Sequence, residues 1–286
     1  MNANEDALYS IVLRLTPTRR ASVRATMGHQ AHAAFLRTVE ESDPALADVL
    51  HMPDMPTRPF TVSMLNGTPP PEGGRLHLSP EETYWLRFTV LYPPIFEQFM
   101  NRFLSGRGRP VIRLGRAVLL IKEILTTPES HPWAGYTSWA DLAMGAEAKE
   151  DVALTFASPT AFSFGQMEWG KKIMVLPLPE IVFSSLSRGW NLLAPSALQI
   201  DRRALRSYLE EHGVVKRIDR LHTRMLKFRR AMQVGFEGDV TFGLMQPDDR
   251  IRGQVNALAS FAFYAGVGTK TTMGMGQCRR KEREEI

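Results

Sequence analysis

Two histidines near the start of the chain have a spacing suited to proton-transfer chemistry. His29 and His32 stand three residues apart, which places both near one face of a helix. Histidine titrates near neutral pH and is a common choice for moving a proton to or from a hydroxyl. A surface or packing role is the alternative for a histidine on a helix. Several arginines stand close enough in the sequence to contact the same ligand: Arg19, Arg20, Arg24 and Arg37.

RNA carries a hydroxyl on which such a histidine can act. The ribose 2′-OH can attack the adjacent phosphate, so a protein that aligns the backbone, moves protons and neutralises charge needs no metal. A metal site on His29 and His32 is a weaker interpretation, because an i,i+3 pair needs further ligands and no acidic cluster stands beside it. We therefore expect no metal ion and no cofactor.

The positive charge of the chain is concentrated in one stretch. The sequence has 35 Lys and Arg against 30 Asp and Glu, a net charge of +5. Residues 216–230 carry +6, which leaves −1 for the rest of the chain. Such a surplus is typical of a surface that binds a polyanion, because neutralised phosphates release condensed counterions. A solvated strand face is the alternative. The bases are Lys216, Arg217, Arg220, Arg224, Lys227, Arg229 and Arg230.

A glycine-rich segment near the C-terminus, GVGTKTTMGMG (266–276), is a second candidate for phosphate binding. Glycines let backbone amides approach an anion closely, and Lys270 adds a cation beside hydroxyl side chains. The context argues against a dinucleotide-binding fold, because a predicted helix precedes the segment and a predicted strand follows it. A tight connection that needs positive φ is the alternative. The candidate residues are Gly266, Gly268, Thr269, Lys270, Thr271, Thr272, Gly274 and Gly276.

Composition and missing motifs narrow the remaining classes. The chain is 44% hydrophobic and 23% charged, which is typical of a globular protein. Its single cysteine, Cys278, predicts no internal disulfide and favours a reducing, cytoplasmic setting. The sequence shows no positive leader and no apolar run near the ~18 residues of a membrane span, so we expect no membrane association. Nucleophile-elbow hydrolases, zincins, dithiol redox enzymes and P-loop NTPases lack their motifs.

The hydrophobic pattern predicts the same order of elements in both halves. In the first half it predicts strands over 7–16, 58–67, 82–91 and 109–127 and helices over 26–41 and 93–106. In the second half it predicts strands over 150–162, 216–236, 238–245 and 275–282, helices over 178–193 and 248–266, and an inserted helix over 201–213. The order β-α-β-β-α-β is ferredoxin-like. We therefore predict an α+β protein with two tandem ferredoxin-like domains, residues 1–130 and 131–286.

Three segments resemble one protein family. LASFAFYAGVGTKTTMGMGQCR (258–279) is similar to the glycine-rich signature of the CRISPR-associated endoribonuclease that cuts precursor CRISPR RNA within its repeats, a member of the RAMP superfamily. SPTAF (158–162) with LPLPEIVFSSLSRGWN (176–191) resembles the opening of that family's second domain. HAAFLRTV (32–39) resembles the helix in which the family often carries its catalytic histidine.

The resemblance implies an enzyme that cleaves repeat RNA without metal and leaves a 5′-hydroxyl and a 2′,3′-cyclic phosphate. His32 would be its general base or acid, with His29 as the nearest substitute. Some members of the family place a tyrosine and a lysine beside the histidine, but the first lysine of this chain is Lys122. The resemblance therefore leaves an arginine to stabilise the pentacoordinate phosphorane. The candidates are Arg24, Arg37 and Arg58.

The implied partner is CRISPR repeat RNA, with other subunits of a CRISPR effector complex as further partners, and the protein would be a monomer or a homodimer. The second half, through residues 216–230 and 266–276, would hold the RNA, while the first half supplies the histidine. The main alternative is a non-catalytic RNA-binding subunit of the same superfamily. A metal-dependent phosphoesterase and a general RNA-binding protein are two further alternatives.

Overall fold

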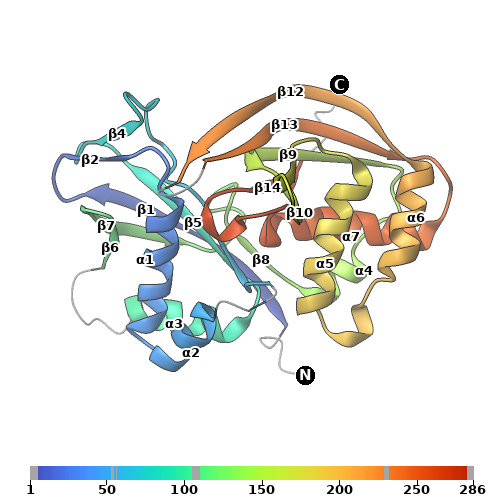
Figure 1. The fold of residues 1–286 in the computed structure, drawn as a ribbon. Coiled ribbons are helices and arrows are strands. Elements are labelled where there is room, and N and C mark those ends of the chain that lie inside the picture. Colours follow the sequence, from blue (N-terminus) through green and yellow to red (C-terminus); the bar gives the residue numbers. More distant parts are fainter. Residues whose placement is uncertain (1–5, 53–54, 56, 105–109, 229–231, 282–286) are drawn as a thin grey trace. The chain divides into compact units, whose positions relative to one another are not determined.

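The computed structural model describes residues 6–52, 55, 57–104, 110–228 and 232–281 (Figure 1). Two of the predicted RNA-binding residues, Arg229 and Arg230, lie outside the described residues. The chain forms two compact units. The first comprises Met1–Thr137 and Thr272–Gly274, and the second comprises Ser138–Thr271 and Met275–Ile286.

The first unit is built on a sheet with the strand order β3-β5-β1-β7-β6, and β8 also pairs with β1. Its strands are β1 (Ala7–Pro17), β3 (Phe60–Val62), β5 (Tyr84–Val90), β6 (Val111–Leu114), β7 (Ala117–Leu125) and β8 (Gly135–Ser138). Helix α1 (Gly28–Glu40) follows β1, and helix α3 (Pro93–Leu104) follows β5. The predicted pairing of residues 58–67 with 82–91 is confirmed, since β3 pairs with β5 in antiparallel fashion. The path β1-α1-β3-β5-α3-β7 is ferredoxin-like.

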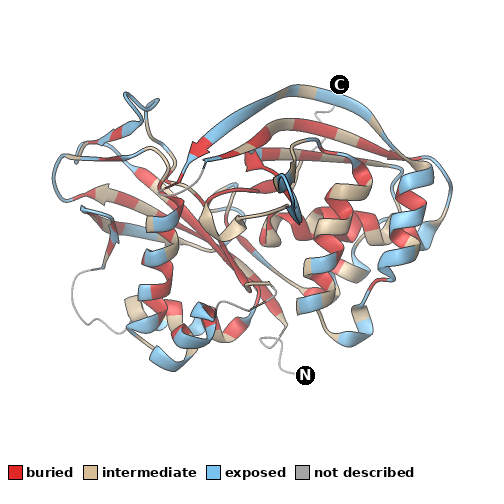
Figure 2. Cartoon of the chain, in the orientation of Figure 1, coloured by how far each residue is buried: buried red, intermediate tan, exposed pale blue. Residues whose placement is uncertain are grey.

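Helix α1 presents an apolar face to the core of the first unit. Ala31, Phe35 and Val39 recur every four residues, the spacing of one helix face, and all three are fully buried. The ring of Phe35 stacks on that of Phe60 in β3, with 4.5 Å between centroids. Figure 2 shows the central strands of the sheet as buried. This packing sets the rotation of α1 and therefore the direction in which its first turn points.

Several short elements of the first unit were not predicted, among them β8. Strand β2 (Ala21–Arg24) pairs with β4 (Arg75–Leu78) in a separate two-stranded ribbon. Helix α2 (Pro44–His51) begins where the carboxylate of Asp43 accepts a hydrogen bond from the amide of Leu46 at 3.0 Å. Each element spans eight residues or fewer. Patterns this short carry little periodic signal.

The second unit repeats the ferredoxin-like path around a sheet with the order β12-β13-β9-β14. Its strands are β9 (Asp151–Thr160), β10 (Phe162–Met167), β11 (Gly170–Met174), β12 (Gly213–Lys227), β13 (Met232–Leu244) and β14 (Cys278–Arg280). Its helices are α4 (Trp139–Met144), α5 (Pro179–Leu193), α6 (Arg202–His212) and α7 (Asp249–Ala265), with short 3₁₀ turns at Ser196–Leu198 and Thr271–Met273. Helix α6 is the predicted insertion. No helix in the described part of the chain is both long and apolar enough to cross a membrane.

The predicted boundary between strands 216–236 and 238–245 is wrong. Strand β12 ends at Lys227 and β13 begins at Met232, so Gly238 lies inside β13 and not at the end of a strand. The pairing of β12 with β13 shifts register between Asp219 and His222. At that shift Gly238 has φ +140°, and a Cβ there would come within 2.8 Å of Leu221 Cα. The glycine therefore accommodates a β-bulge.

Candidate active site

His32 lies in the first turns of α1 and is half-buried. Its Nδ1 lies 3.1 Å from the carbonyl oxygen of Thr272, which belongs to the same unit although it stands 240 residues later in the chain. A carbonyl oxygen only accepts hydrogen bonds, so Nδ1 must carry the proton and donate it. In a neutral ring this leaves the lone pair on Nε2, which is the form a general base needs.

The surroundings of His32 keep its ring neutral. Burial lowers its pKa from 6.5 to about 4, the hydrogen bond to Thr272 opposes the shift, and the charge of Arg58 adds to it. Electrostatic interactions with His51 and His29 also lower the pKa of His32. His32 is therefore neutral at pH 7 in the unliganded protein. A neutral imidazole can accept a proton from a hydroxyl, whereas a general acid would have to be protonated beforehand.

Two glycines allow the segment Thr272–Gly274 to lie against α1. Gly28 is the first residue of the helix, and a Cβ on it would come within 1.8 Å of the carbonyl oxygen of Met273. Gly274 has φ +89°, and a Cβ there would come within 2.5 Å of Met64 Cγ. Both contacts lie within the first unit. The backbone oxygen that faces His32 is therefore placed by close packing that has no room for side chains.

Arg58 is the one arginine, of the three proposed for charge stabilisation, whose charge shifts the pKa of His32. Its guanidinium donates to the carbonyl oxygens of Leu50 and Met52 at the C-terminal end of α2, the second at 3.3 Å. Cations are stabilised at this end of a helix. Arg24 lies on β2 and Arg37 in the last turn of α1, and both are exposed.

His29 is exposed, one turn before His32, and it reaches His32 electrostatically. The ring of Phe60 is also close to His32, with 5.5 Å between centroids. Within the described ranges, no three His, Cys, Asp or Glu side chains are grouped so that they could hold a metal ion. The chemistry that this arrangement supports is proton transfer beside a fixed positive charge.

The glycine-rich segment uses several of its amides to hold its own shape. The amide of Gly266 donates to Ala262 O at 3.0 Å, that of Gly268 to Ser185 Oγ at 3.1 Å, and that of Thr269 to Ala161 O at 2.8 Å. Gly266 and Gly268 have φ +66° and +82°. These features match the alternative of a tight connection that needs positive φ.

Much of the positive charge on β12 is neutralised within the second unit. Nitrogen–oxygen distances of 2.6 to 2.8 Å join Arg217 to Asp219, Arg220 to Asp239 and Arg224 to Glu237. The exposed Lys227, near the end of the strand, has no such carboxylate partner among the described residues. The excess positive charge counted in the sequence is therefore smaller on the surface, because acidic side chains from neighbouring positions and from the facing strand pair with these bases.

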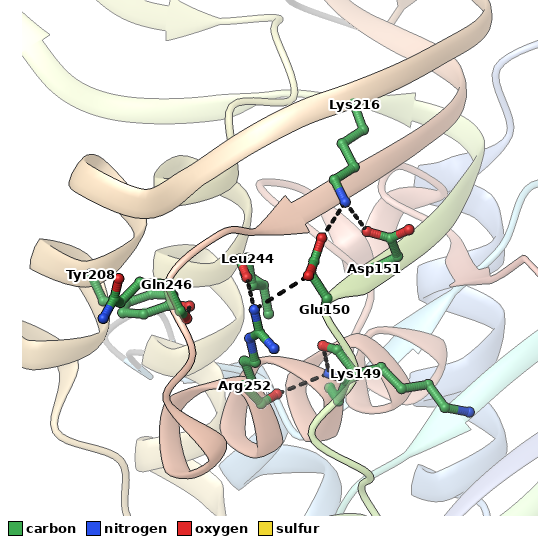
Figure 3. Close-up of polar contacts among 9 residues, drawn as sticks. Lys149, Glu150, Asp151, Tyr208, Lys216, Leu244, Gln246 and Arg252 are labelled. Atoms are coloured by element: carbon green, nitrogen blue, oxygen red, sulfur yellow. Dashed lines mark hydrogen bonds and ion pairs between the residues drawn. The ribbon is translucent and has the colours of Figure 1, made fainter.

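Lys216 belongs to a separate polar network (Figure 3). Its Nζ lies 2.5 Å from Glu150 and 2.6 Å from Asp151, where the chain enters β9. Arg252 of α7 lies 3.5 Å from the same Glu150 and donates to the carbonyl oxygen of Leu244 at 2.5 Å. These contacts join the ends of β12, β13 and β9 to a helix. Lys216 is therefore held by structural contacts, unlike Lys227.

Sequence reasoning did not identify Thr272 as the partner of His32, nor Gly28 as the residue that makes room for it. Thr272 was a candidate only through its place in the glycine-rich segment, and its contact with His32 is made by the backbone. The only sign of this close contact in the sequence was a glycine in the first turn of a predicted amphipathic helix, because glycine is unfavourable inside helices.

Comparisons with known proteins identify the family. Residues 7–144 match the family model described as the CRISPR Cas6 N-terminal domain, and residues 154–278 match the one described as CRISPR-associated endoribonuclease Cas6. The chain belongs to the Cas6 family. This confirms the resemblance seen in the sequence. The Cas6 membership and the two strand orders also confirm the predicted α+β fold with two ferredoxin-like domains.

Individual Cas6 proteins match over different shares of the chain. A Streptococcus thermophilus protein described as CRISPR-associated endoribonuclease Cas6 is 29% identical over 133 residues, which are 46% of this chain and 51% of that protein. The match therefore spans about half the length of the curated relative. A product complex of a Thermus thermophilus Cas6 has a TM-score of 0.81 and 26% identity, and the alignment covers 97% of this chain and 100% of that one.

A second Cas6 protein is similar over the same length. A structure of its histidine-to-alanine mutant has a TM-score of 0.70 and 26% identity, with 97% of this chain and 100% of that chain covered.

Proposed function

We propose that this Cas6 protein is an endoribonuclease that cleaves precursor CRISPR RNA within its repeats, with His32 as the general base. The observation that carries the proposal is the 3.1 Å contact between His32 Nδ1 and the carbonyl oxygen of Thr272, which leaves the lone pair on Nε2. Family membership and the names of the relatives support the choice of substrate.

In the proposed reaction, Nε2 of His32 takes the proton of the ribose 2′-OH at the cleavage site. The 2′ oxygen then attacks the adjacent phosphorus, and the bond from phosphorus to the 5′ oxygen breaks. The leaving 5′ oxygen takes up a proton from water. The products are a 2′,3′-cyclic phosphate and a 5′-hydroxyl, and no step uses a metal ion.

Arg58 is the proposed electrostatic partner of His32. Two of its N–H groups are used on Leu50 and Met52, and a guanidinium has five N–H donors in all. Its positive charge would stabilise the phosphorane as negative charge develops on the phosphate oxygens. Arg58 would thus take the role that a lysine has in some relatives.

RNA binding would depend on cations that the fold leaves without carboxylate partners. Lys227 and Lys270 are our strongest candidates from the predicted set, because phosphate contacts position the RNA without reading its sequence. Membership of a larger CRISPR effector complex, and the choice between monomer and homodimer, stay predictions.

Cleavage of repeat RNA by the purified protein in EDTA tests the proposal. The 2′-OH mechanism predicts that RNA with a 2′-deoxyribose immediately upstream of the cut still binds but stays intact. His32→Ala should lower the single-turnover rate by roughly 10²- to 10⁴-fold with little change in affinity. His77→Ala, which removes an exposed histidine on β4, is the matched control and should have no effect.

Three outcomes would contradict the proposal. Binding without any product would assign the non-catalytic RNA-binding role. Cleavage of the 2′-deoxy substrate would exclude the mechanism. Equal losses of affinity and rate in His32→Ala would make His32 a structural residue.

A further inference from the structure

The hairpin formed by β10 and β11 carries large apolar side chains in an exposed position. Trp169, in the turn between the two strands, is 72% exposed, and Phe164 and Met167 on β10 are 46% and 36% exposed. Single exposed apolar residues are common on protein surfaces, but several together on one small element are typical of a binding surface. The hairpin therefore presents an apolar surface suited to binding a partner.

The same hairpin carries positive charge. Lys171 and Lys172 are neighbours on β11 and both are exposed. The Nζ of Lys172 lies 5.8 Å from the centre of the Phe164 ring. Glu168 is the only acid of the hairpin. Aromatic rings interleaved with lysines are the usual composition of a surface that binds single-stranded nucleic acid.

This positive charge continues to the glycine-rich segment. Burial lowers the pKa of Lys270, and the like charge of Lys171 lowers it further, so the two ammonium groups feel each other. The Nζ of Lys270 lies 4.3 Å from the centre of the Phe228 ring. Lys270 itself has φ +59°, an unusual conformation for a residue other than glycine.

Several cations of the second unit are paired with carboxylates. Lys149, Lys281 and the bases at 216, 217, 220 and 224 each lie within 4.0 Å of a carboxylate. Among the described residues, Lys171, Lys172 and Lys270 have no carboxylate within that distance. Positive charge that the fold leaves uncompensated is complementary to phosphate, whereas an apolar protein partner would have to bury it unpaired.

We propose that the β10–β11 hairpin binds unpaired nucleotides of the RNA, with Trp169 and Phe164 stacking on bases and Lys171 and Lys172 contacting phosphates. The inference rests on the proposed function for the identity of the RNA. Unpaired nucleotides are the fitting partner because bases inside a duplex do not expose their faces for stacking.

Binding measured by fluorescence anisotropy with two repeat RNAs tests this inference. The first RNA is the repeat held in a base-paired form. The second is the same base-paired repeat with an added single-stranded uridine tail. Trp169→Ala should weaken binding of the tailed RNA by about 5- to 100-fold and leave binding of the untailed RNA unchanged. Trp169→Phe should restore most of the affinity, because phenylalanine keeps an aromatic face. Tyr136→Ala, which removes a 61% exposed aromatic side chain from β8, is the control.

The lysines have a separate readout. Replacing Lys171 and Lys172 together by alanine should reduce the salt slope for the tailed RNA by about 1.4, since each contact with a single strand contributes about 0.7. An unchanged slope would remove the lysines from the interface.

Outcomes that overturn the inference are distinct from those that overturn the nuclease assignment. Equal affinities of wild type and Trp169→Ala for the tailed RNA, or equal losses for both RNAs, would exclude stacking of unpaired bases by this hairpin. If Trp169→Ala leaves RNA binding unchanged but abolishes binding of a protein partner, the hairpin is a protein-binding surface. If binding depends on the tail but no RNA is cleaved, the proposed nuclease activity is excluded and the hairpin binding site is retained.

Discussion

Replacing Gly28 by alanine tests whether the segment Thr272–Gly274 positions His32. A Cβ on Gly28 would stand 1.8 Å from Met273 O, and Cβ contacts shorter than 3.0 Å essentially never occur, so the two backbones must separate by at least 1.2 Å. A movement of that size along the contact would carry Thr272 O out of hydrogen-bond range of His32 Nδ1, which now lies 3.1 Å away. The ring would then lose the acceptor that keeps its proton on Nδ1.

The effect should be large on the reaction and smaller on folding. A misplacement of about 1 Å in a catalytic group costs roughly 10²-fold in rate. Overpacking of this kind lowers the free energy of unfolding by about 1–3 kcal/mol. We therefore expect Gly28→Ala to fold and to bind repeat RNA nearly as wild type, with a single-turnover rate lower by about 100-fold. Nitrogen-15 NMR of the His32 ring should show loss of the Nδ1–H tautomer.

Two further glycine variants make the result interpretable. Gly253→Ala in α7 adds the same methyl group to a helix where the nearest neighbouring atom lies 3.9 Å away, so rate and tautomer should stay as in wild type. Gly274→Ala strains the segment from its other side, at φ +89°, and should slow the reaction as Gly28→Ala does. A wild-type rate and tautomer in Gly28→Ala would refute the idea that this segment orients the histidine.

Other predictions follow from the same contacts. Because burial lowers the pKa of His32 from 6.5 to about 4, the unfolded chain takes up this proton before the native state does, and the free energy of unfolding should fall by about 3 kcal/mol as the pH falls from 6.5 to 4. Urea unfolding of His32→Gln should show a flatter decline over that range, and an unchanged decline would mean that His32 titrates normally. Arg58→Gln should raise the pKa of His32 in an NMR titration, since it removes a nearby positive charge, and it should slow cleavage. Lys227→Ala should reduce the salt slope of RNA binding by up to about 0.9, whereas Lys216→Ala should leave the slope unchanged and lower stability, because Lys216 is paired with Glu150 and Asp151. The reverse pattern would show that the ion-paired end of β12 is the one that contacts RNA.

The main helices and strands could be predicted because their residues repeat at regular intervals. In α1, Ala31, Phe35 and Val39 show the helical period in the sequence and face the core in the structure. The prediction that one strand ends at 236 and the next begins at Gly238 failed, because a glycine in a β-bulge has the same backbone freedom as a glycine in a turn. The short ribbon of β2 and β4 left no periodic trace that could have revealed it.

The candidate site also has features that the sequence showed and contacts that only the structure revealed. A histidine in the first helix was visible in the sequence, because residue type and local spacing are properties of neighbouring positions. The sequence alone therefore determined the order of the main elements, the family resemblance and the identity of His32 as a candidate. Only the tertiary structure decided that Thr272, 240 residues away, faces its ring and that acids of β12 and β13 pair with Arg217, Arg220 and Arg224 of the basic stretch. Hydrogen bonds and ion pairs depend on distances between side chains and backbone brought together by folding, and the spacing of residues along the chain carries no record of those distances.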